Sequence, residues 1–355
     1  MEPQCYDIVG LMSGTSLDGL DLVACRFFRE NGQWNYRVLA AETRAYPEEW
    51  LERLAGLTQA GGMELARAHA DLGHYMGRCV AAFVQENRLQ PLLVASHGHT
   101  VFHQPERGFT LQIGDGAALA AECGQMVVND FRVTDVALGG QGAPLVPIGD
   151  ELLFPQYDAC LNIGGISNIS FRYEGRRVAF DIAPANQVFN CLAALKGLPF
   201  DRDGLLARQG RADAACLERL NALAFYRRPF PKSLGKEWVD AECLPVLKAS
   251  GLSVEDALAT AVEHTAFQIA RVLNGYRIRT LLLSGGGARN VFLRERIAAL
   301  AVQAQCCMPS EEVVDYKEAV IFAFLGLKRW LGEANCLQSV TGASRDCCGG
   351  ALWLP

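Results

Sequence analysis

The chain has 355 residues, of which 50% are hydrophobic, 20% are charged and 35 are glycine. This length and composition are typical of a compact globular protein of about two domains, and they exclude a small disulfide-stapled module, a fibrous protein and a disordered tail. The net charge of −6, with no run of more than two lysines or arginines, leaves no basic surface for a phosphate backbone. We therefore expect no nucleic-acid partner.

The thirteen cysteines are scattered along the chain and never occur in a C-x-x-C pattern. An odd number without metal-ligand spacing is typical of reduced, mostly buried thiols and not of a disulfide framework or a zinc ribbon. The first residues lack a basic segment, and no apolar stretch reaches the roughly 18 residues of a membrane span. The sequence therefore predicts a cytoplasmic protein with no membrane partner.

The N-terminal region is expected to form an antiparallel meander of three strands, over residues 6–12, 20–28 and 36–43. Residues 13–19, between the first two strands, are Ser, Gly, Thr, Ser, Leu, Asp and Gly. Small hydroxyl and glycine residues in a tight connection leave backbone amides free to point at an anion. We expect this turn to bind one.

The rest of the first half is expected to alternate helix and strand. Apolar residues at helical spacing predict an amphipathic helix over 63–88. A buried strand over 92–95 leads into the polar residues 96–100, and a strand over 109–113 opens onto a Gly-Asp-Gly turn. Strands that end in polar residues at a turn are how α/β proteins present chemistry. The glycine- and proline-rich residues 134–150 predict a crossing between two domains.

The second half begins in the same way as the first. Strands are expected over 157–163, 169–173 and 178–182, with a small-residue turn at 164–168 between the first two. The recurrence of strand, Gly/Ser turn, strand and strand about 150 residues apart predicts a duplicated βββ unit. A buried strand over 280–284 feeds a triple glycine, and helices are expected over 186–195, 212–224, 253–275, 290–303 and 317–331.

Three glycine-rich turns at strand ends, at 14–19, 164–168 and 285–287, point to a ligand with several negatively charged oxygens. Such turns are also used simply as tight connections, but three of them favour a nucleotide. The P-loop, dinucleotide-binding and protein-kinase signatures are all missing. What remains is a fold in which two hairpin turns, one per domain, hold the phosphates while the third glycine segment lies against the adenosine.

The string GLMSGTSLDGLD over residues 10–21 resembles the opening of the anhydro-N-acetylmuramic acid kinases, which belong to the superfamily of sugar kinases, heat-shock ATPases and actin. The likeness extends over nearly the whole chain. Its further blocks are at 96–98, 100–101, 111–116, 129–132, 139–147, 162–168, 181–186, 284–290, 318–323 and 341–343.

For the fold, the resemblance implies a two-domain α/β protein of the actin-like ATPase (ribonuclease H-like) class, with duplicated βββαβα units and an interdomain cleft. We expect an N-terminal domain over residues 1–133 and a C-terminal domain over 134–334, with residues 335–355 packing back on the first. The family is typically dimeric, so a homodimer is also implied.

For the reaction, the resemblance implies that ATP, with Mg²⁺, phosphorylates O6 of 1,6-anhydro-N-acetylmuramic acid while water opens the 1,6-anhydro bridge. The product is N-acetylmuramic acid 6-phosphate, an intermediate of peptidoglycan recycling. Because O6 of the anhydro sugar carries no proton, the base must activate a water that attacks C1. Asp181, at the end of the third strand of the second unit, is the expected base.

The resemblance also assigns binding residues. The expected ATP contacts are Gly14, Thr15, Ser16, Leu17, Asp18, Gly19, Leu20, Asp21, Gly164, Gly165, Ser167, Asn168, Gly285, Gly286 and Gly287. Asp18 is expected to contact Mg²⁺ through water. The expected sugar contacts are Ser96, His97, Thr100, Arg132, Asn186 and Glu318. Arg132 is suited to pair with the lactyl carboxylate as a bidentate partner, although a surface ion pair is its simpler role.

Several alternatives stay open. Asp181 could cap a strand end or a helix, and Ala183 stands where the family usually has glycine. The spacing of His97, His99 and His103 permits a metal site, but further ligands would be needed, and family members more often carry Gln at the position of His99. The protein could also be an ordinary hydroxyl sugar kinase, or an actin-like ATPase without a sugar substrate.

Overall fold

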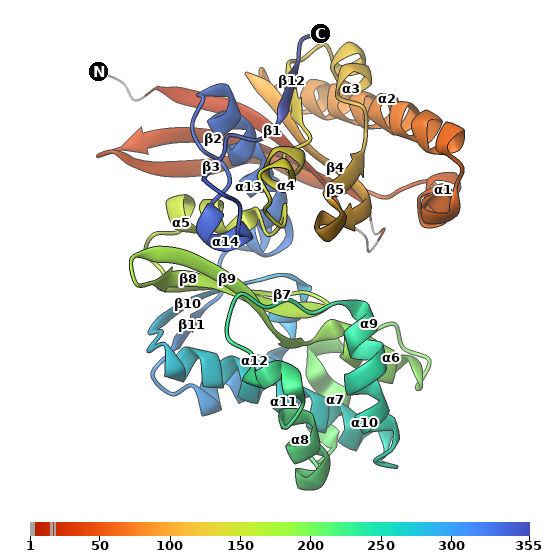
Figure 1. The fold of residues 1–355 in the computed structure, drawn as a ribbon, viewed down its shortest axis with the longest axis vertical. Helices are drawn as coiled ribbons and strands as arrows, with labels where there is room; N and C mark the ends of the chain where they lie inside the picture. The colour runs from red at the N-terminus through yellow and green to blue at the C-terminus, as the bar shows by residue number, and fades with distance from the viewer. Residues whose placement is uncertain (1–3, 15–16, 18) are drawn as a thin grey trace. The chain divides into compact units, whose positions relative to one another are not determined.

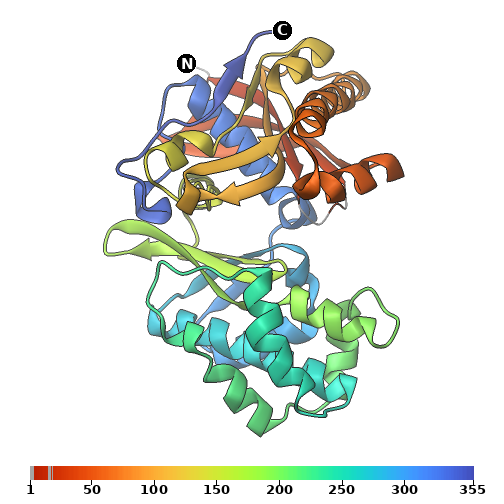
Figure 2. The same ribbon diagram turned by 45° about the vertical axis from the view of Figure 1, so that its right-hand side comes forward.

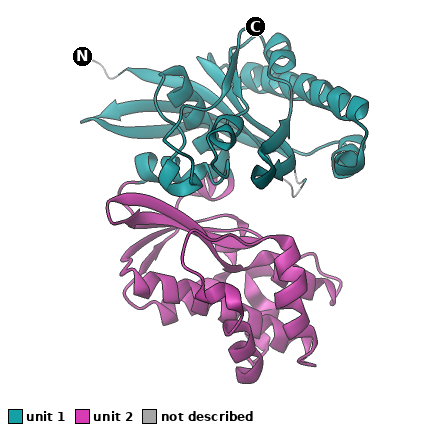
Figure 3. Cartoon of the chain, viewed as in Figure 1, with its two compact units in different colours: residues 1–154, 316–355 teal, residues 155–315 magenta. Residues whose placement is uncertain are grey.

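The computed structural model describes residues 4–14, 17 and 19–355. The expected ATP contacts Thr15, Ser16 and Asp18 lie outside the described residues. The chain divides into two compact units, shown in different colours in Figure 3: unit 1 comprises Met1–Phe154 and Tyr316–Pro355, and unit 2 comprises Pro155–Asp315. None of the helices in the described ranges is both long and apolar enough to cross a bilayer.

The sheet of unit 1 is built on the antiparallel meander expected from the sequence. Its strands are β1 (Cys5–Ser13), β2 (Leu20–Glu30), β3 (Gln33–Arg44), β4 (Leu93–Gln104), β5 (Phe109–Ile113), β6 (Val127–Asn129) and β12 (Ala351–Trp353). Their order is β12-β6-β4-β1-β2-β3, with β5 paired to β4 (Figure 1). The pairs β1–β4 and β4–β6 are parallel, whereas β1–β2 and β2–β3 are antiparallel.

Unit 1 also contains helices that contribute buried residues to it. They are α1 (Glu48–Gly56), α2 (Gly62–Glu86), α3 (Gly116–Cys123), α4 (Val133–Ala137), α5 (Val146–Leu153), most of α13 (Glu311–Trp330) and α14 (Gln338–Thr341). On α2, the apolar positions predicted from their spacing are buried, among them Leu72, Met76 and Val80. They share one core with Val9 and Leu11 of β1.

Unit 2 repeats the sheet of unit 1. Its strands are β7 (Ala159–Ile163), β8 (Ile166–Tyr173), β9 (Arg176–Pro184), β10 (Thr280–Ser284) and β11 (Gln305–Cys307), in the order β11-β10-β7-β8-β9. The strands β8 and β9 form a long twisted hairpin (Figure 2). The order β6-β4-β1-β2-β3 and the order β11-β10-β7-β8-β9 correspond strand for strand, and their pairings have the same directions. The predicted duplication is therefore confirmed.

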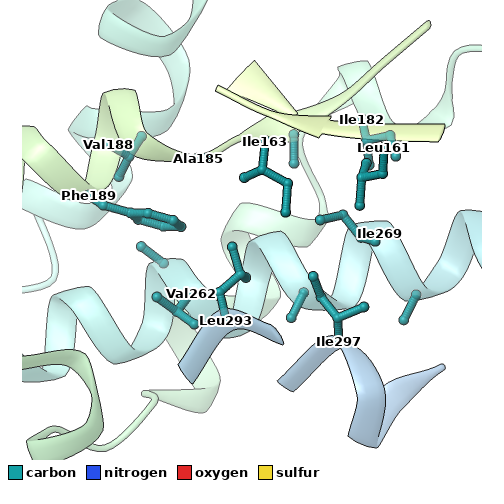
Figure 4. Packing of buried hydrophobic residues seen from close by; sticks show 14 of the residues in the cluster. Leu161, Ile163, Ile182, Ala185, Val188, Phe189, Val262, Ile269, Leu293 and Ile297 are labelled. Carbon is teal, nitrogen blue, oxygen red and sulfur yellow. The ribbon is translucent and has the colours of Figure 1, made fainter. Parts of the chain in front are cut away.

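The helices of unit 2 are grouped around one long helix, residues 254–275, which contacts β9. They are α6 (Asn186–Ala194), α7 (Leu205–Gln209), α8 (Ala214–Asn221), α9 (Lys236–Trp238), α10 (Leu244–Lys248), α11 (Val254–Gly275) and α12 (Val291–Leu300). Val262 and Ile269 of α11 share one buried cluster with Leu161, Ile163 and Ile182 of the sheet (Figure 4). Each fully buried aliphatic side chain of this kind contributes about 1.5–3 kcal/mol.

The compact units divide the chain differently from the expected domains, which ended at residues 133 and 334. The first change of unit falls after Phe154, because the glycine-rich stretch packs within unit 1. Gly142 N donates to the buried Asp135 carboxylate, and a Cβ on Gly149 would meet the Ile321 side chain at 2.6 Å. The second change falls after Asp315, inside α13, whose Phe322 and Phe324 are buried in unit 1.

Candidate active site

In unit 2, the turn between β7 and β8 holds the start of helix α6. Ala185 N and Gln187 N donate to Gly165 O at 2.9 and 3.1 Å, and Asn186 N donates to Gly164 O at 3.2 Å. These bonds satisfy amides that a helix start otherwise leaves without an intrahelical partner. The turn and Asn186 are therefore held in one local arrangement.

The third glycine segment lies against the same turn. A Cβ on Gly285 would lie 2.4 Å from Asn162 Oδ1, and a Cβ on Gly287 would lie 2.4 Å from Ile163 Cγ2 and 3.1 Å from Asn186 Nδ2. Gly285 also has a φ of +79°, a conformation that side chains disfavour. Two of the three glycine-rich turns and Asn186 are thus close together within unit 2.

Ser167 supports the hairpin from inside. Its hydroxyl donates to Ala183 O at 2.9 Å and accepts from Ala183 N at 3.2 Å, so β8 and β9 are tied at this level. Ala183 lies in β9 with ordinary strand geometry, so the backbone does not require glycine there. The pairing register sets Asn168 opposite Asp181.

Asp181 is a partly buried carboxylate on β9. Its Oδ2 accepts from Leu234 N at 2.7 Å, while its own N donates to Lys232 O at 3.0 Å. Burial raises the pKa of Asp181 to about 6, and the Leu234 amide opposes that rise. Helix α6 has Ala185 as its N-cap and no side-chain cap, so Asp181 does not cap it. The carboxylate of Asp181 is therefore more basic than that of an exposed aspartate, and it lies on the hairpin of β8 and β9.

The amino group of Lys232 does not neutralise that carboxylate through an ion pair in the described part of the chain. Lys232 Nζ lies 4.5 Å from the centre of the Phe225 ring and 5.9 Å from that of Phe180. Burial lowers the pKa of Lys232, and the charge of Arg271 lowers it further. The loop carrying Lys232 and Leu234 therefore positions Asp181 through its backbone.

In unit 1, the first glycine-rich turn follows Ser13, which is anchored on both sides. Tyr46 OH donates to Ser13 Oγ at 2.7 Å, and Ser13 Oγ lies 3.0 Å from His99 Nδ1. Leu17 has a φ of +59° and donates its N–H to Gly14 O at 3.3 Å. The hydrogen bond from Tyr46 was not predicted from the sequence, because no local pattern links Tyr46 to Ser13.

Asp21 lies at the end of the same turn, just inside β2. Its Oδ1 accepts a hydrogen bond of 2.6 Å from Thr43 Oγ1. Gly19, with a φ of +151°, lies so close to β3 that a Cβ there would meet Thr43 and Arg44. The carboxylate at this position is therefore held by its neighbours in the sheet.

The buried His97 of β4 and the partly exposed Arg132 at the start of α4 form a pair. Arg132 Nη2 and Nε lie 2.8 and 3.2 Å from His97 Nε2, and Arg132 Nη1 donates to Gly142 O at 2.8 Å. Burial lowers the pKa of His97 well below its usual value, with the charge of Arg132 acting in the same direction. Burial lowers the pKa of Arg132 to about 10, so its guanidinium is still charged at neutral pH.

Glu318, on α13, lies within electrostatic reach of Arg132. Burial raises the pKa of Glu318, whereas the charges of Arg132 and Lys317 lower it. Lys317 Nζ is 2.6 Å from Asp150 Oδ1, and both side chains are buried. An acidic and a basic group expected to contact the sugar are therefore brought close together in unit 1.

The other expected sugar contacts are placed differently. Ser96 is fully buried and accepts from Gly98 N at 3.2 Å, so its hydroxyl supports the backbone of β4. Thr100 is partly exposed and accepts from Gln112 Nε2 at 3.3 Å. Asn186 lies in unit 2, beside the glycine segments, whereas the other five expected sugar contacts lie in unit 1.

The three histidines of β4 do not gather into a metal site. His97 pairs with Arg132, His99 with Ser13, and His103 Nδ1 lies 3.0 Å from Thr110 Oγ1. Within the described ranges, the only group of three potential ligands is Asp135, Cys336 and Cys347.

Hydrogen bonds already occupy the Asp135 carboxylate of that group. Thr341 Oγ1 and Gly142 N donate to it at 2.7 Å each, and Cys336 Sγ donates at 3.0 Å. Burial raises the pKa of Cys336, which keeps its thiol protonated. This group ties the C-terminal segment to α4, a role that sequence reasoning missed because its members are some 200 residues apart.

Two units with one shared sheet order, each with a glycine-rich sequence after its first strand, define a two-domain protein of the actin-like ATPase class. A sequence model described as "Anhydro-N-acetylmuramic acid kinase" matches residues 6–355. The chain belongs to the anhydro-N-acetylmuramic acid kinase family.

Named relatives agree over nearly the full length. The chain is 38% identical to the anhydro-N-acetylmuramic acid kinase of Gloeobacter violaceus, covering 95% of this chain and 96% of the relative. It is 38% identical to that of Rhodospirillum rubrum, with 97% and 93% covered. It is 35% identical to that of Haemophilus influenzae, with 99% and 98% covered.

The solved structures that this chain resembles have lower sequence identity to it than the named relatives do. Component A of (R)-2-hydroxyglutaryl-CoA dehydratase from Acidaminococcus fermentans is similar with a TM-score of 0.45 and 10% identity, over 91% of this chain and 98% of that one. A ROK hexokinase from Thermus thermophilus gives a TM-score of 0.40 and 15% identity, over 91% and 99%.

Proposed function

We propose that this protein uses ATP to phosphorylate O6 of 1,6-anhydro-N-acetylmuramic acid while water opens the 1,6-anhydro bridge. The products are N-acetylmuramic acid 6-phosphate and ADP, and the activity serves peptidoglycan recycling. Family membership over residues 6–355 and the names of the relatives support the substrate. The single observation that carries the mechanism is the basic, partly buried carboxylate of Asp181.

The chemistry couples two displacements. Asp181 takes a proton from water, and the water oxygen forms a bond to C1 of the sugar. The C1–O6 bond breaks, and its electron pair goes to O6. O6 then bonds to the γ-phosphorus of ATP, and ADP leaves with the electron pair of the broken P–O bond. An ordinary exposed aspartate has a pKa near 3.9, so a carboxylate whose pKa is about 6 is a stronger base and is still mostly ionised at neutral pH.

Nucleotide binding is assigned to the glycine segments. Gly164, Gly165 and Gly285–Gly287 present backbone without side chains, which suits the approach of phosphate or adenosine. The turn after Ser13 supplies the corresponding segment of unit 1. Ser13, the residue before that turn, is held by its contacts with Tyr46 and His99.

Sugar binding is assigned chiefly to Arg132, Glu318 and Asn186. Arg132 is the cation suited to the lactyl carboxylate, and Glu318 offers a carboxyl group for a sugar hydroxyl or amide. Thr100 is partly exposed on the same strand as His97.

We further assign Mg²⁺ to the ATP phosphates, since Mg²⁺ in kinases is usually held by substrate phosphates and one or two carboxylates. The oxygen chemistry of this part of unit 1 fits, because Asp21 keeps a carboxylate beside the first turn. The ion would neutralise charge on the triphosphate.

The thirteen cysteines are free thiols, which supports a reducing, cytoplasmic location. Exposed apolar side chains support self-association into a homodimer, among them Leu195, Leu198, Phe200 and Leu205 of unit 2. Analytical ultracentrifugation tests the homodimer, and a monomer at micromolar concentration would contradict it.

Product mass tests the function directly. Incubation with ATP and the anhydro sugar should give a product heavier than the sugar by one phosphoryl group and one water. In water enriched in heavy oxygen, the label should appear on C1. A product that gains phosphate but no water would identify an ordinary hydroxyl kinase. A rate of ATP hydrolysis that is the same with and without the sugar would identify an ATPase that does not act on this sugar.

A further inference from the structure

The hydrogen bonds of Arg132 determine which nitrogen of His97 carries the proton. Arginine only donates, so His97 Nε2, at 2.8 Å from Nη2 and 3.2 Å from Nε, must offer its lone pair. The neutral ring then carries its hydrogen on Nδ1, which donates to Gly98 O at 2.9 Å. Both partners of the ring therefore select the same tautomer.

Packing fixes the plane of that ring. His97 is 5% exposed, and its ring centre lies 4.6 Å from that of Phe322 on α13. Gly98 has a φ of +72°, and a Cβ there would lie 2.6 Å from Ile113 O. Glycine at this position therefore allows the tight bend that turns its carbonyl back toward Nδ1. The ring is held by its neighbours on both sides.

The pair leaves a defined part of Arg132 for a ligand. Of the five N–H donors of an arginine, the one on Nε and one on Nη2 go to His97, and one on Nη1 goes to Gly142 O. Among the residues that the structure describes, no acceptor is bonded to the remaining N–H of each terminal nitrogen, and two such groups are the number that a carboxylate accepts in a bidentate pair. Arg132 as a whole residue is partly exposed, so a ligand can approach it.

We propose that His97 is a positioning residue that holds the Arg132 guanidinium for the lactyl carboxylate, and that it thereby makes the enzyme selective for anhydro sugars that carry an acid. The inference rests on the proposed function. His97 uses both ring nitrogens within the protein, so it acts on the sugar through Arg132. The hydrogen bonds that Arg132 donates to His97 and Gly142 order its long side chain before the sugar binds. Binding therefore loses less side-chain entropy.

Selectivity between two sugars tests the proposal. The measured quantity is the ratio of kcat/KM for 1,6-anhydro-N-acetylmuramic acid to kcat/KM for 1,6-anhydro-N-acetylglucosamine, which lacks the lactyl group. His97→Leu cannot accept a hydrogen bond, and this ratio should fall by about tenfold or more, mainly through KM for the acid. His97→Gln places an accepting oxygen near the position of Nε2 and should restore the ratio to within about threefold of wild type.

Two controls separate positioning from general damage. His103→Leu removes an exposed histidine of the same strand, β4, and should leave the ratio within about twofold. With Arg132→Ala already present, His97→Leu should lower the ratio no further, because the two residues act as one unit. Equal losses with both sugars in His97→Leu, or a ratio that His97→Gln does not restore, would overturn the positioning role.

A spectroscopic readout keeps this inference separate from the function. In wild-type protein at neutral pH, nitrogen chemical shifts should show His97 with a bare Nε2 and a protonated Nδ1. A protonated Nε2 would overturn the inference even if the enzyme phosphorylates the acid as proposed. The expected tautomer without any sugar turnover would reject the proposed function and, with it, the selectivity role of His97.

Discussion

Single side chains show how burial shifts the pKa of an acid and of a base in opposite directions. Desolvation raises the pKa of Asp181 to about 6 and lowers that of Arg132 to about 10. Both groups nevertheless remain mainly charged at neutral pH, because neither shift crosses it. Asp181 gains basicity from burial, whereas Arg132 keeps its full charge and is held by His97 and Gly142 O.

Removal of the Asp181 charge should stop chemistry and spare nucleotide binding. Asp181→Asn keeps the size of the side chain but cannot take a proton from water, so kcat should fall by about a thousandfold. The dissociation constant for ATP, measured by calorimetry, should stay within about threefold of wild type. Activity within about tenfold of wild type would remove Asp181 from the mechanism.

The pH profile should report the same group. Protonation of Asp181 removes the base, so kcat/KM should fall as the pH drops through about 6 and should level off above it. Below this value, each pH unit should cost about tenfold in kcat/KM. A profile that stays flat down to pH about 5 would contradict the assignment.

At the scale of elements, Gly285 and Gly287 have no room for a side chain, whereas Gly286 between them does. A Cβ on Gly285 or Gly287 would meet β7 or its turn within 3 Å, whereas Gly286 has open space around the same position. The segment is therefore pressed against the end of β7 at its two ends. This contact brings the second and third glycine-rich turns together.

The contrast gives a matched pair of variants. Gly287→Ala should lower the free energy of unfolding by about 1–3 kcal/mol, because Ile163 must move. Gly286→Ala should change it by less than about 0.5 kcal/mol. Chemical denaturation of both proteins measures the difference, and equal effects would contradict the close packing.

At the scale of the whole molecule, the two units differ in how the chain builds them. Unit 2 is one continuous stretch, Pro155–Asp315, with its own hydrophobic core. Unit 1 is built from both ends of the chain, because β12 pairs with β6 and the Thr341 hydroxyl donates a hydrogen bond to Asp135. Only unit 2 is therefore a candidate for independent folding.

Expression of residues 155–315 alone tests this difference. The fragment should unfold cooperatively on heating, with the helix content of unit 2 in its circular dichroism spectrum. A chain that ends at Asp315 should retain that transition but lose the folding of residues 1–154, because α13 and the C-terminal segment are missing. A disordered 155–315 fragment would show that unit 2 depends on unit 1.

Much of the architecture was available from the sequence, because it depends on local patterns. Alternating apolar residues predicted β1–β3 and β7–β9 to within a few residues, and helical spacing predicted α2 and α11. Elements without such patterns were missed. The helix α5 begins with Val-Pro in a glycine-rich stretch, and the sequence indicated a linker there.

Family motifs and glycine patterns in the sequence by themselves determined the class of protein, the duplicated unit and the choice of Asp181, since these are properties of short segments. The tertiary structure decided the extent of the units, the tautomer of His97, the anchors of Ser13 and the basicity of Asp181. The reason is physical: pKa values, hydrogen-bond partners and packing depend on groups that only folding brings close, such as Leu234 to Asp181 and Tyr46 to Ser13.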